Sequence, residues 1–241
     1  MDLRLAGRRA VITGGTSGIG AACARGLADE GVRVGLIDRV ASDDLAELSV
    51  RADVSDESQL RTAMADLAEQ LGGIDLLVCC AGTSGPFGKS VERIDGSDWA
   101  RVFAVNVTGA FLAVKYALPW LRRSEQPAVV LLGSDSAFVS APGMLPYGAS
   151  KGAVVQLARG LATELAGDGV RVNCVCPSIV DTPMSRADLG LADFDHVDYP
   201  VQTPQEVAGQ VLYLCSPLSR PVNAAAWVSD FGYLARSSLP A

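Results

Sequence analysis

Tyr147 and Lys151 are the residues of this sequence best suited to acid–base chemistry. They lie at the two ends of the segment Tyr147-Gly-Ala-Ser-Lys151, which opens a predicted helix, so both side chains lie on one helical face, one turn apart. A free phenol has a pKa near 10, and a neighbouring ammonium favours its phenolate form. The pair therefore predicts a proton-transfer site; a solvated Tyr and Lys on a surface helix is the alternative.

A glycine-rich turn, Thr13-Gly-Gly-Thr-Ser-Gly-Ile-Gly20, lies between the first predicted strand and the first predicted helix. In that position, glycines let the backbone approach a pyrophosphate, and the helix N-terminus supplies N–H groups and partial positive charge. No lysine stands at the Walker A position, which excludes a P-loop NTPase. A tight connection that binds nothing is the alternative to a dinucleotide site.

Asp38 ends the second predicted strand, 18 residues after Gly20. A carboxylate there accepts hydrogen bonds from a ribose 2′-OH and repels a 2′-phosphate, which favours NAD over NADP. Ser17 stands in the turn where a basic residue could have held that phosphate, which also favours NAD. Arg39, directly after Asp38, could favour either NAD or NADP. Asp53, at the end of the third strand, is assigned to the adenine, and a turn residue before a helix is the alternative.

Strand-like and helical patterns alternate along the whole chain, which predicts an α/β fold with one parallel sheet and helices on both faces. We expect a single doubly wound Rossmann-type domain over residues 1–241, with a short lid at about 183–203 in the longest irregular stretch, 182–203. We expect Ser55 to cap the second helix, a kink near Pro119, and a short helix or loop at 43–48. The predicted strands are 9–13, 32–38, 50–53, 74–80, 128–133, 170–175 and 225–229, and the predicted helices are 18–31, 56–71, 96–123, 147–166 and 204–215.

The composition argues against several classes of protein. With 241 residues, 49% hydrophobic and 20% charged, the chain can build a globular core and is not disordered. A net charge of −7 argues against a nucleic-acid partner. The first residues do not resemble a secretory signal and the longest uncharged runs are too short for a bilayer, so we expect a cytoplasmic protein without a membrane partner. Six cysteines and one histidine, His196, predict buried reduced thiols and no metal site.

Taken together, the glycine turn, Asp38, Cys79-Cys-Ala-Gly82, Asn106, Ser134 and the Tyr147–Lys151 segment resemble the short-chain dehydrogenase/reductase family. The resemblance extends from Leu5 to about Gly232. It implies a single Rossmann-type domain with a seven-stranded parallel sheet and a nicotinamide cofactor across the carboxyl ends of the strands. It also implies a homo-oligomer, a tetramer or a dimer.

The resemblance assigns four catalytic residues. Tyr147 would be the acid–base group, Lys151 would support it and bind the nicotinamide ribose, and Ser134 would hydrogen-bond the substrate oxygen, with Ser136 as a rival. Asn106 would hold a water that links Lys151 to solvent, and a simple interhelix hydrogen bond is the alternative. The implied cofactor-binding residues are Gly14, Thr16, Ser17, Gly18, Ile19, Gly20, Asp38, Asp53, Val54, Ala81, Gly82, Tyr147, Lys151, Pro177, Ile179 and Thr182.

The chain departs from the family pattern at several positions. Cys79 and Cys80 replace two asparagines that help to fix the central strands, and Ser178 follows Pro177 where glycine is usual. Phe231 stands in place of a glycine near the C-terminus. Asp135, beside Ser134, is also unusual and is a candidate substrate contact.

The substrate is predicted from the cavity wall and the lid. The candidate wall residues are Phe87, Asp135, Phe138, Met144 and Leu145. The lid has four acids, Asp188, Asp193, Asp195 and Asp198, against one basic residue, Arg186. Such a lid disfavours anionic substrates, unless the acids merely face water.

We therefore predict an NAD-dependent oxidoreductase that interconverts a secondary alcohol and a ketone on a small, neutral, largely apolar molecule, such as a cyclic or alicyclic alcohol. One alternative is an NADP-dependent 3-ketoacyl-thioester reductase, but Asp38 disfavours NADP. The other is a non-catalytic NAD(H)-sensing or scaffold protein, but such a protein would not need Ser134, Tyr147 and Lys151.

Overall fold

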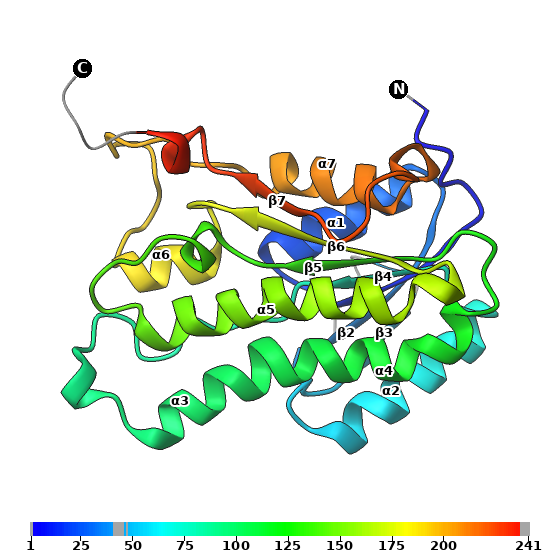
Figure 1. Ribbon diagram of the computed structural model, residues 1–241, viewed down its shortest axis with the longest axis horizontal. Coiled ribbons are helices and arrows are strands. Elements are labelled where there is room, and N and C mark those ends of the chain that lie inside the picture. Colours follow the sequence, from blue (N-terminus) through cyan, green and yellow to red (C-terminus); the bar gives the residue numbers. More distant parts are fainter. Residues whose placement is uncertain (1, 41–45, 47, 237–241) are drawn as a thin grey trace.

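Seven parallel strands form one sheet in the computed structural model, which describes residues 2–40, 46 and 48–236 (Figure 1). The strand order is β3-β2-β1-β4-β5-β6-β7, so the chain moves outward from β1 to β3, returns to the centre and moves outward again from β4. The carboxyl ends of β1 and β4 flank the point where the direction reverses, which is where open α/β sheets bind ligands. This confirms the predicted single Rossmann-type domain. The strands are β1 (Arg9–Thr13), β2 (Arg33–Asp38), β3 (Leu48–Arg51), β4 (Leu76–Cys79), β5 (Ala128–Leu132), β6 (Arg171–Pro177) and β7 (Ala226–Ser229).

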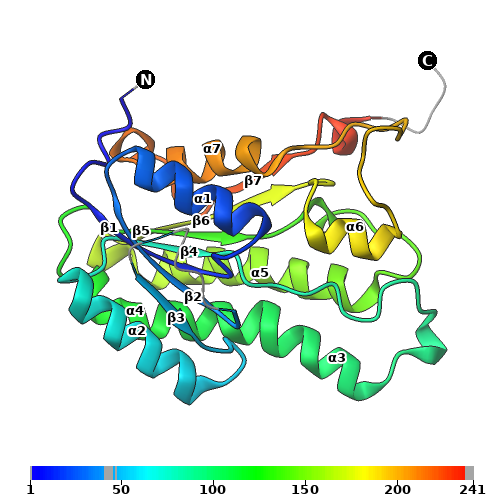
Figure 2. The ribbon, with the colours of Figure 1, turned by 180° about the vertical axis from the view of Figure 1, so that it is seen from behind.

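Helices cover both faces of the sheet (Figures 1 and 2). Helices α1 (Gly18–Asp29) and α7 (Pro204–Cys215) lie on one face, and α2 (Glu57–Leu71), α4 (Gly109–Leu121) and α5 (Leu145–Glu164) lie on the other. Successive strand residues belong to opposite cores: Leu76 packs with α1 and α7, and Leu77 packs with α2, α4 and α5. Strands that are apolar on both sides are therefore the consequence of a sheet buried between two helical layers.

The longest helical stretch, Gly96–Leu121, has an irregular turn that the sequence did not predict. Helix α3 (Gly96–Phe103) passes into a π-helical segment, Ala104–Thr108, and then into α4. The π-helical irregularity thus lies at 104–108, and Pro119, where a kink is predicted, lies inside α4. The helix ends at Leu121 rather than at residue 123. The stretch is apolar and long enough to cross a membrane, but its elements pack against α2 and α5, as core helices do.

Two local predictions are wrong. Asp56, not Ser55, caps α2: its carboxylate accepts hydrogen bonds from the Ser58 and Gln59 N–H groups, both at 3.0 Å, while the Ser55 hydroxyl donates to Asp53 at 2.6 Å. The stretch 182–203 is not wholly irregular, because it begins with helix α6 (Pro183–Leu189). Thr182 and Ser185 form a capping box with proline in the first turn, a signal that the sequence carried.

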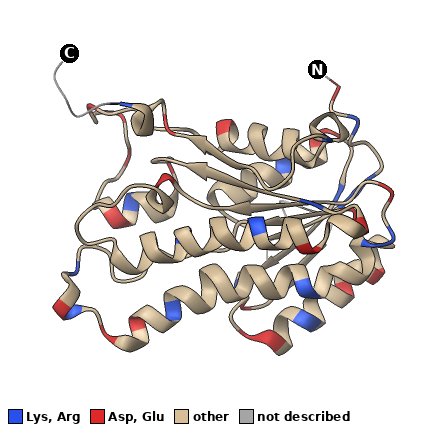
Figure 3. Ribbon diagram, in the orientation of Figure 1, with Lys and Arg blue, Asp and Glu red and all other residues tan. Residues whose placement is uncertain are grey.

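Most predicted boundaries lie within a few residues of the observed ones. The third strand comes two residues earlier than predicted, at Leu48–Arg51, and α5 begins at Leu145 rather than Tyr147. The predicted helix or loop at 43–48 falls mostly outside the described residues. Acidic and basic positions are interspersed over the helices and loops (Figure 3).

Candidate active site

A cavity of about 460 Å³ runs along the carboxyl ends of the central strands, from the β1–α1 turn to α6. Its volume lies in the usual range for small-molecule sites, ~300–1,000 Å³. Every predicted cofactor-binding residue except Thr16 lies on its wall, together with Ser134, Tyr147 and Lys151. The lining also has Arg39, Ser136 and Asp188, which the sequence analysis discussed, and Pro183, Met184, Ser185 and Leu189 from the predicted lid. Residues without a predicted role complete it: Ile37, Ala52, Cys80, Thr83, Ser84, Arg101, Val105, Leu132, Gly133, Ser178 and Val180.

The glycine turn is packed so closely that only glycine fits at two of its positions. Gly14 has a φ of +68°, and a Cβ there would lie 2.5 Å from the Ala81 nitrogen. A Cβ on Gly20 would lie 2.0 Å from the Gly14 carbonyl oxygen. Ser17, the N-cap residue of α1, makes no side-chain capping bond, so the first N–H groups of α1 have no partner from that hydroxyl. Exposed backbone donors at a helix N-terminus fit the pyrophosphate of a dinucleotide.

Asp38 fixes one end of the cavity beside this turn. Its Oδ2 accepts a hydrogen bond from the Thr16 N–H at 3.1 Å, so Thr16 contacts Asp38 instead of lining the cavity. Asp53 also lines this end, and the Ser55 hydroxyl that donates to its carboxylate lowers its pKa. Arg101, on α3, reaches the same end, and no sequence signal could have indicated it because its position depends on how α3 lies against the sheet.

Lys151 and Tyr147 lie one turn apart on α5, as predicted. The Lys151 Nζ lies 5.4 Å from the centroid of the Tyr147 ring and donates a hydrogen bond to the Leu132 carbonyl oxygen at 2.7 Å. Lys151 is only 6% exposed. An ammonium has three hydrogens, and among the described residues one finds a partner, so the others are available to groups in the cavity.

Ser134 follows β5 and is buried at the cavity wall. Its Oγ accepts a hydrogen bond from the Ser136 N–H at 3.1 Å and donates one to Asp135 Oδ1 at 3.0 Å. Ser136, the rival for the Ser134 role, also lines the cavity, and its hydroxyl contacts the same Asp135 oxygen at 3.5 Å. The geometry keeps both serines at the cavity wall, with Ser134 the more buried of the two.

Asn106 lies in the π-helical segment and does not line the cavity. Its amide donates to the Thr83 carbonyl and to the Ser150 hydroxyl, both at 2.9 Å, and its oxygen accepts from the Thr83 N–H at 2.8 Å. These bonds clamp the loop after β4 to the start of α5, one turn from Tyr147. The predicted role in holding a water for Lys151 stays a prediction. π-Helical segments of this kind occur mostly as single turns inside α-helices, frequently at functional sites.

Some of the predicted substrate-wall residues line the cavity and others do not. Phe87, Asp135 and Met144 line the cavity, but Phe138 and Leu145 do not, and these two are 43% and 49% exposed. Leu145 lies two residues before Tyr147 on α5, which is about 200° around the helix, so the two side chains point to opposite sides.

Helix α6 forms part of the wall at the other end of the cavity. Met184, Asp188 and Leu189 line it, and the Ser84 hydroxyl donates to Asp188 Oδ1 at 2.7 Å, which ties α6 to the loop after β4. The other three predicted lid acids, Asp193, Asp195 and Asp198, are exposed and lie outside the lining. For these three, the alternative that they face water fits the structure.

The cysteines are free, as predicted, but not all are buried. Cys80 is half-buried and lines the cavity, whereas Cys79 is buried behind it, and burial raises the pKa of the Cys79 thiol to about 12. Among the described residues, no group of three metal-type ligands comes together.

The chain is similar to named dehydrogenases and reductases over most of its length. A family model described as enoyl-(acyl carrier protein) reductase matches residues 14–234. The chain is 37% identical to 2-(S)-hydroxypropyl-CoM dehydrogenase 3 of Xanthobacter autotrophicus, over 98% of this chain and all of that protein. It is 34% identical to a mitochondrial borneol dehydrogenase of Lavandula x intermedia, over 95% of this chain and 91% of that one.

Solved structures resemble the whole fold. The ligand-free aldohexose dehydrogenase of Thermoplasma acidophilum is 28% identical, with a TM-score of 0.89 and 98% of each chain covered. A 3-ketoacyl-(acyl-carrier-protein) reductase of Brucella melitensis in complex with NADH is 27% identical, with a TM-score of 0.87, over 95% of this chain and 98% of that one.

Proposed function

The chain belongs to the short-chain dehydrogenase/reductase family, and we propose that it is an NAD-dependent enzyme that interconverts a secondary alcohol and a ketone. The observation that carries the proposal is the convergence of Ser134, Tyr147 and Lys151 on the wall of a cavity that continues to the glycine turn. A protein that only senses or stores the dinucleotide needs the glycine turn but has no use for a proton-transfer group at the other end of the cavity.

The glycine turn and the N-terminus of α1 would hold the pyrophosphate of NAD, and Asp38 the adenosine ribose. When bound, the nicotinamide supplies the hydride acceptor in alcohol oxidation and the hydride donor in ketone reduction. The free hydrogens of Lys151 would bind the neighbouring ribose.

Tyr147 would take the hydroxyl proton of the alcohol, or return it to the ketone oxygen in the reverse direction. The Lys151 ammonium, one turn away, stabilises the phenolate that this transfer leaves. Ser134 would donate a hydrogen bond to the substrate oxygen and so stabilise the charge that develops on it. Asn106 acts as a positioning residue, because it fixes the loop at Thr83 and the first turn of α5.

We propose NAD rather than NADP because of Asp38. Its carboxylate lies beside the glycine turn, where it would accept hydrogen bonds from a free ribose 2′-OH and repel a 2′-phosphate. Arg39 and Arg101 line the same end and oppose this preference. Selectivity is therefore the first property to measure.

We propose a neutral substrate with a largely apolar body, because Phe87, Met144, Met184 and Leu189 line the end beyond Tyr147. Cyclic and alicyclic secondary alcohols fit this wall, and borneol, named for one relative, is of that kind. A 3-ketoacyl-thioester reductase is the second candidate, favoured by one structural neighbour and by the acyl-carrier wording of the matching family model. Asp38, Asp135 and Asp188 oppose an NADP-dependent enzyme that takes an anionic carrier.

The test is a spectrophotometric screen of secondary alcohols with NAD and, in parallel, with NADP. Acetoacetyl-CoA with NADPH or NADH is the competing assay. We expect NAD reduction by at least one cyclic alcohol, with a higher kcat/KM for NAD than for NADP. Activity confined to the thioester would establish the second candidate instead.

A further inference from the structure

Two carboxylates from separate segments line the substrate end of the cavity. Asp135 follows Ser134 after β5, and Asp188 lies in the last turn of α6. Figures 1 and 2 both show α6 beside the segment that follows β5. We infer that the substrate carries, besides the reacting alcohol or ketone, a second hydrogen-bond donor that these carboxylates bind. This donor is a hydroxyl or an ammonium, and an ammonium would make the substrate cationic where the proposed function has a neutral one. The inference rests on the proposed function.

Asp135 competes with the substrate for the hydroxyl of Ser134. The Ser134 Oγ donates its hydrogen to Asp135 Oδ1 at 3.0 Å while it accepts one from the Ser136 N–H. A hydroxyl has one hydrogen, so Ser134 must release Asp135 when it donates to a substrate oxygen. Asp135 then keeps the longer contact from the Ser136 hydroxyl, at 3.5 Å, but a half-buried carboxylate that loses its shorter bond costs free energy unless another donor replaces it. A donor on the carbon next to the reacting one would supply that replacement and leave Ser134 free for the reacting oxygen.

Asp188, on α6, is the second carboxylate that accepts a hydrogen bond from a serine hydroxyl. Its Oδ1 accepts the Ser84 hydroxyl at 2.7 Å, and Oδ2 has no hydrogen-bond partner among the described residues. Asp188 is half-buried, and burial raises its pKa because the charged form is desolvated. A carboxylate can accept about four hydrogen bonds, so each of these two cavity-lining acids can accept further hydrogen bonds.

The charges at this end oppose anionic substrates. Lys151 is the single basic residue among the described residues that line the substrate end, and it lies beside Tyr147. Arg186, the basic residue of α6, pairs with Asp181 at 2.6 and 2.8 Å and lies outside the lining. A carboxylate or sulfonate on the substrate would therefore meet two like charges, with Lys151 as the single cation at that end to offset them.

The substrate test compares four six-membered ring alcohols with NAD: cyclohexanol, trans-cyclohexane-1,2-diol, trans-2-aminocyclohexanol and 2-hydroxycyclohexanecarboxylate. A hydrogen bond to a charged group contributes enough to raise kcat/KM about ten-fold, so we expect the diol or the amino alcohol to exceed cyclohexanol by that factor. We expect the carboxylate to be the poorest substrate. Whichever of the diol and the amino alcohol has the higher kcat/KM identifies the donor as a hydroxyl or an ammonium.

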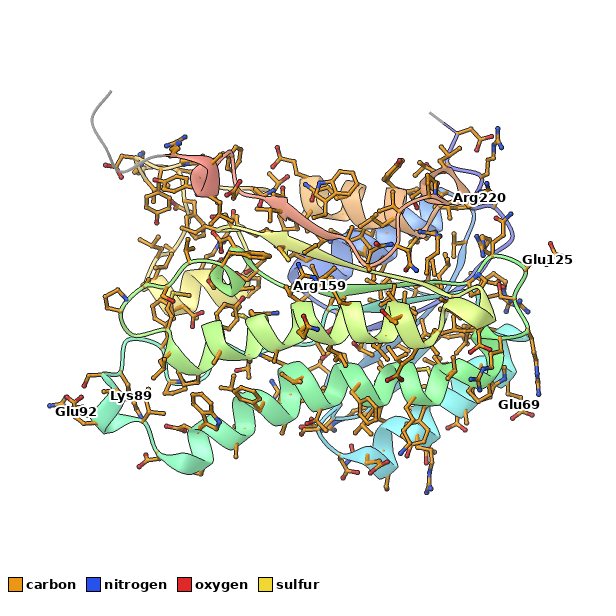
Figure 4. All side chains as sticks on the ribbon, in the orientation of Figure 1. Glu69, Lys89, Glu92, Glu125, Arg159 and Arg220 are labelled. Carbon is orange, nitrogen blue, oxygen red and sulfur yellow. The ribbon has the colours of Figure 1, made fainter. Side chains whose placement is uncertain are left out.

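The variant test uses Asp135→Asn and Asp188→Asn, which keep the side-chain size and an acceptor oxygen for Ser134 or Ser84. The readout is the ratio of kcat/KM for the better donor substrate to kcat/KM for cyclohexanol, in which a general loss of activity cancels. We expect each variant to lower this ratio several-fold. Glu92→Gln is the matched control, because Glu92 also accepts a serine hydroxyl, from Ser90 at 2.7 Å, but projects from the end of the molecule outside the cavity (Figure 4).

The outcomes separate the two proposals. If the enzyme oxidises no alcohol with either nucleotide, the proposed function is wrong. If kcat/KM for cyclohexanol equals or exceeds kcat/KM for both the diol and the amino alcohol, the inference about the second donor is wrong and the proposed function stands. The same conclusion follows if both Asn variants keep the wild-type ratio.

Discussion

The two ends of the cavity are built in different ways. At the cofactor end, the glycine turn is fixed by backbone hydrogen bonds to neighbouring strands, from the Gly14 N–H to the Ile37 carbonyl and from the Cys80 N–H to the Thr13 carbonyl, at 2.8 and 2.9 Å. At the substrate end, α6 is tied to the loop after β4 by a hydrogen bond between two side chains, Ser84 and Asp188.

The difference shows which part of the site the fold dictates. Backbone bonds at the carboxyl ends of parallel strands come with the sheet itself, so the backbone of the cofactor end depends little on the surrounding side chains, provided that glycine is kept where a Cβ would clash. Side-chain bonds between segments outside the sheet change with single substitutions, so the substrate end is where specificity can vary on one scaffold. Variants at the two ends should therefore change different kinetic parameters.

Tyr147 lies between the two ends, and its replacement should have the largest effect. Tyr147→Phe removes the hydroxyl and keeps the ring, so we expect kcat to fall about 1,000-fold, in the range for loss of a general acid–base group. NADH binding, measured by fluorescence titration, should stay within about two-fold because the glycine turn, Asp38 and Lys151 keep the other contacts assigned to the nucleotide. Tyr116→Phe is the control, because that hydroxyl binds Glu57 outside the cavity. Full turnover in Tyr147→Phe would contradict the mechanism and favour a binding protein.

Gly20→Ala tests the cofactor end. The new Cβ would lie 2.0 Å from the Gly14 carbonyl oxygen, and a backbone atom cannot yield as a flexible side chain can. We expect NAD affinity to fall about 100-fold, which corresponds to the upper range of overpacking costs. Isothermal titration with NAD gives the affinity, and urea unfolding shows whether the fold is also destabilised.

The matched control for Gly20 is Gly209, in α7, where an added Cβ has no atom within 4 Å. We expect Gly209→Ala to keep NAD affinity and to raise the free energy of unfolding by up to about 1 kcal/mol, because alanine favours the helix. If both alanines left NAD affinity unchanged, the glycine turn would not be the cofactor site.

The sequence predicted the cofactor end of the cavity better than the substrate end. The strand ends that carry Gly14, Asp38 and Ser134 must meet at one edge of a parallel sheet, so their placement on one cavity follows from chain order and hydrophobic pattern. Thr16 is the exception at the cofactor end, since its N–H binds Asp38.

The substrate end was predicted less well because its residues lie on segments whose packing the sequence pattern does not determine. Phe138 and Leu145 are apolar and near the catalytic residues in sequence, but they point to solvent. Ser84 lies on the wall because α6 folds over it, a contact between residues 104 positions apart. The lid was predicted as irregular because the Thr182 capping signal preceded no long apolar pattern.

Asp38→Asn is expected to have a smaller effect than either of the first two substitutions. It removes the charge but keeps an oxygen for the Thr16 N–H, so the turn should remain intact. A charge close to the 2′-phosphate contributes about 1 kcal/mol or more at a solvated site, so we expect the NAD to NADP ratio of kcat/KM to fall about ten-fold. Asp29→Asn is the control, because Asp29 is exposed at the end of α1 and outside the cavity lining. An unchanged ratio in Asp38→Asn would remove the basis for the NAD assignment.

Ser84→Ala should have the smallest effect and should change a different kinetic parameter. The substitution removes the hydroxyl that donates to Asp188, so α6 loses one tie to the loop after β4 while the glycine turn and Tyr147 are untouched. A hydrogen bond of this kind contributes about 1 kcal/mol, so we expect KM for the alcohol to rise about five-fold with kcat and NAD affinity unchanged. Ser90→Ala removes a similar bond, to Glu92, outside the cavity and should leave KM at the wild-type value. If Ser84→Ala weakened NAD binding as much as alcohol binding, the two ends of the cavity would be one coupled unit, and the division between them would be wrong.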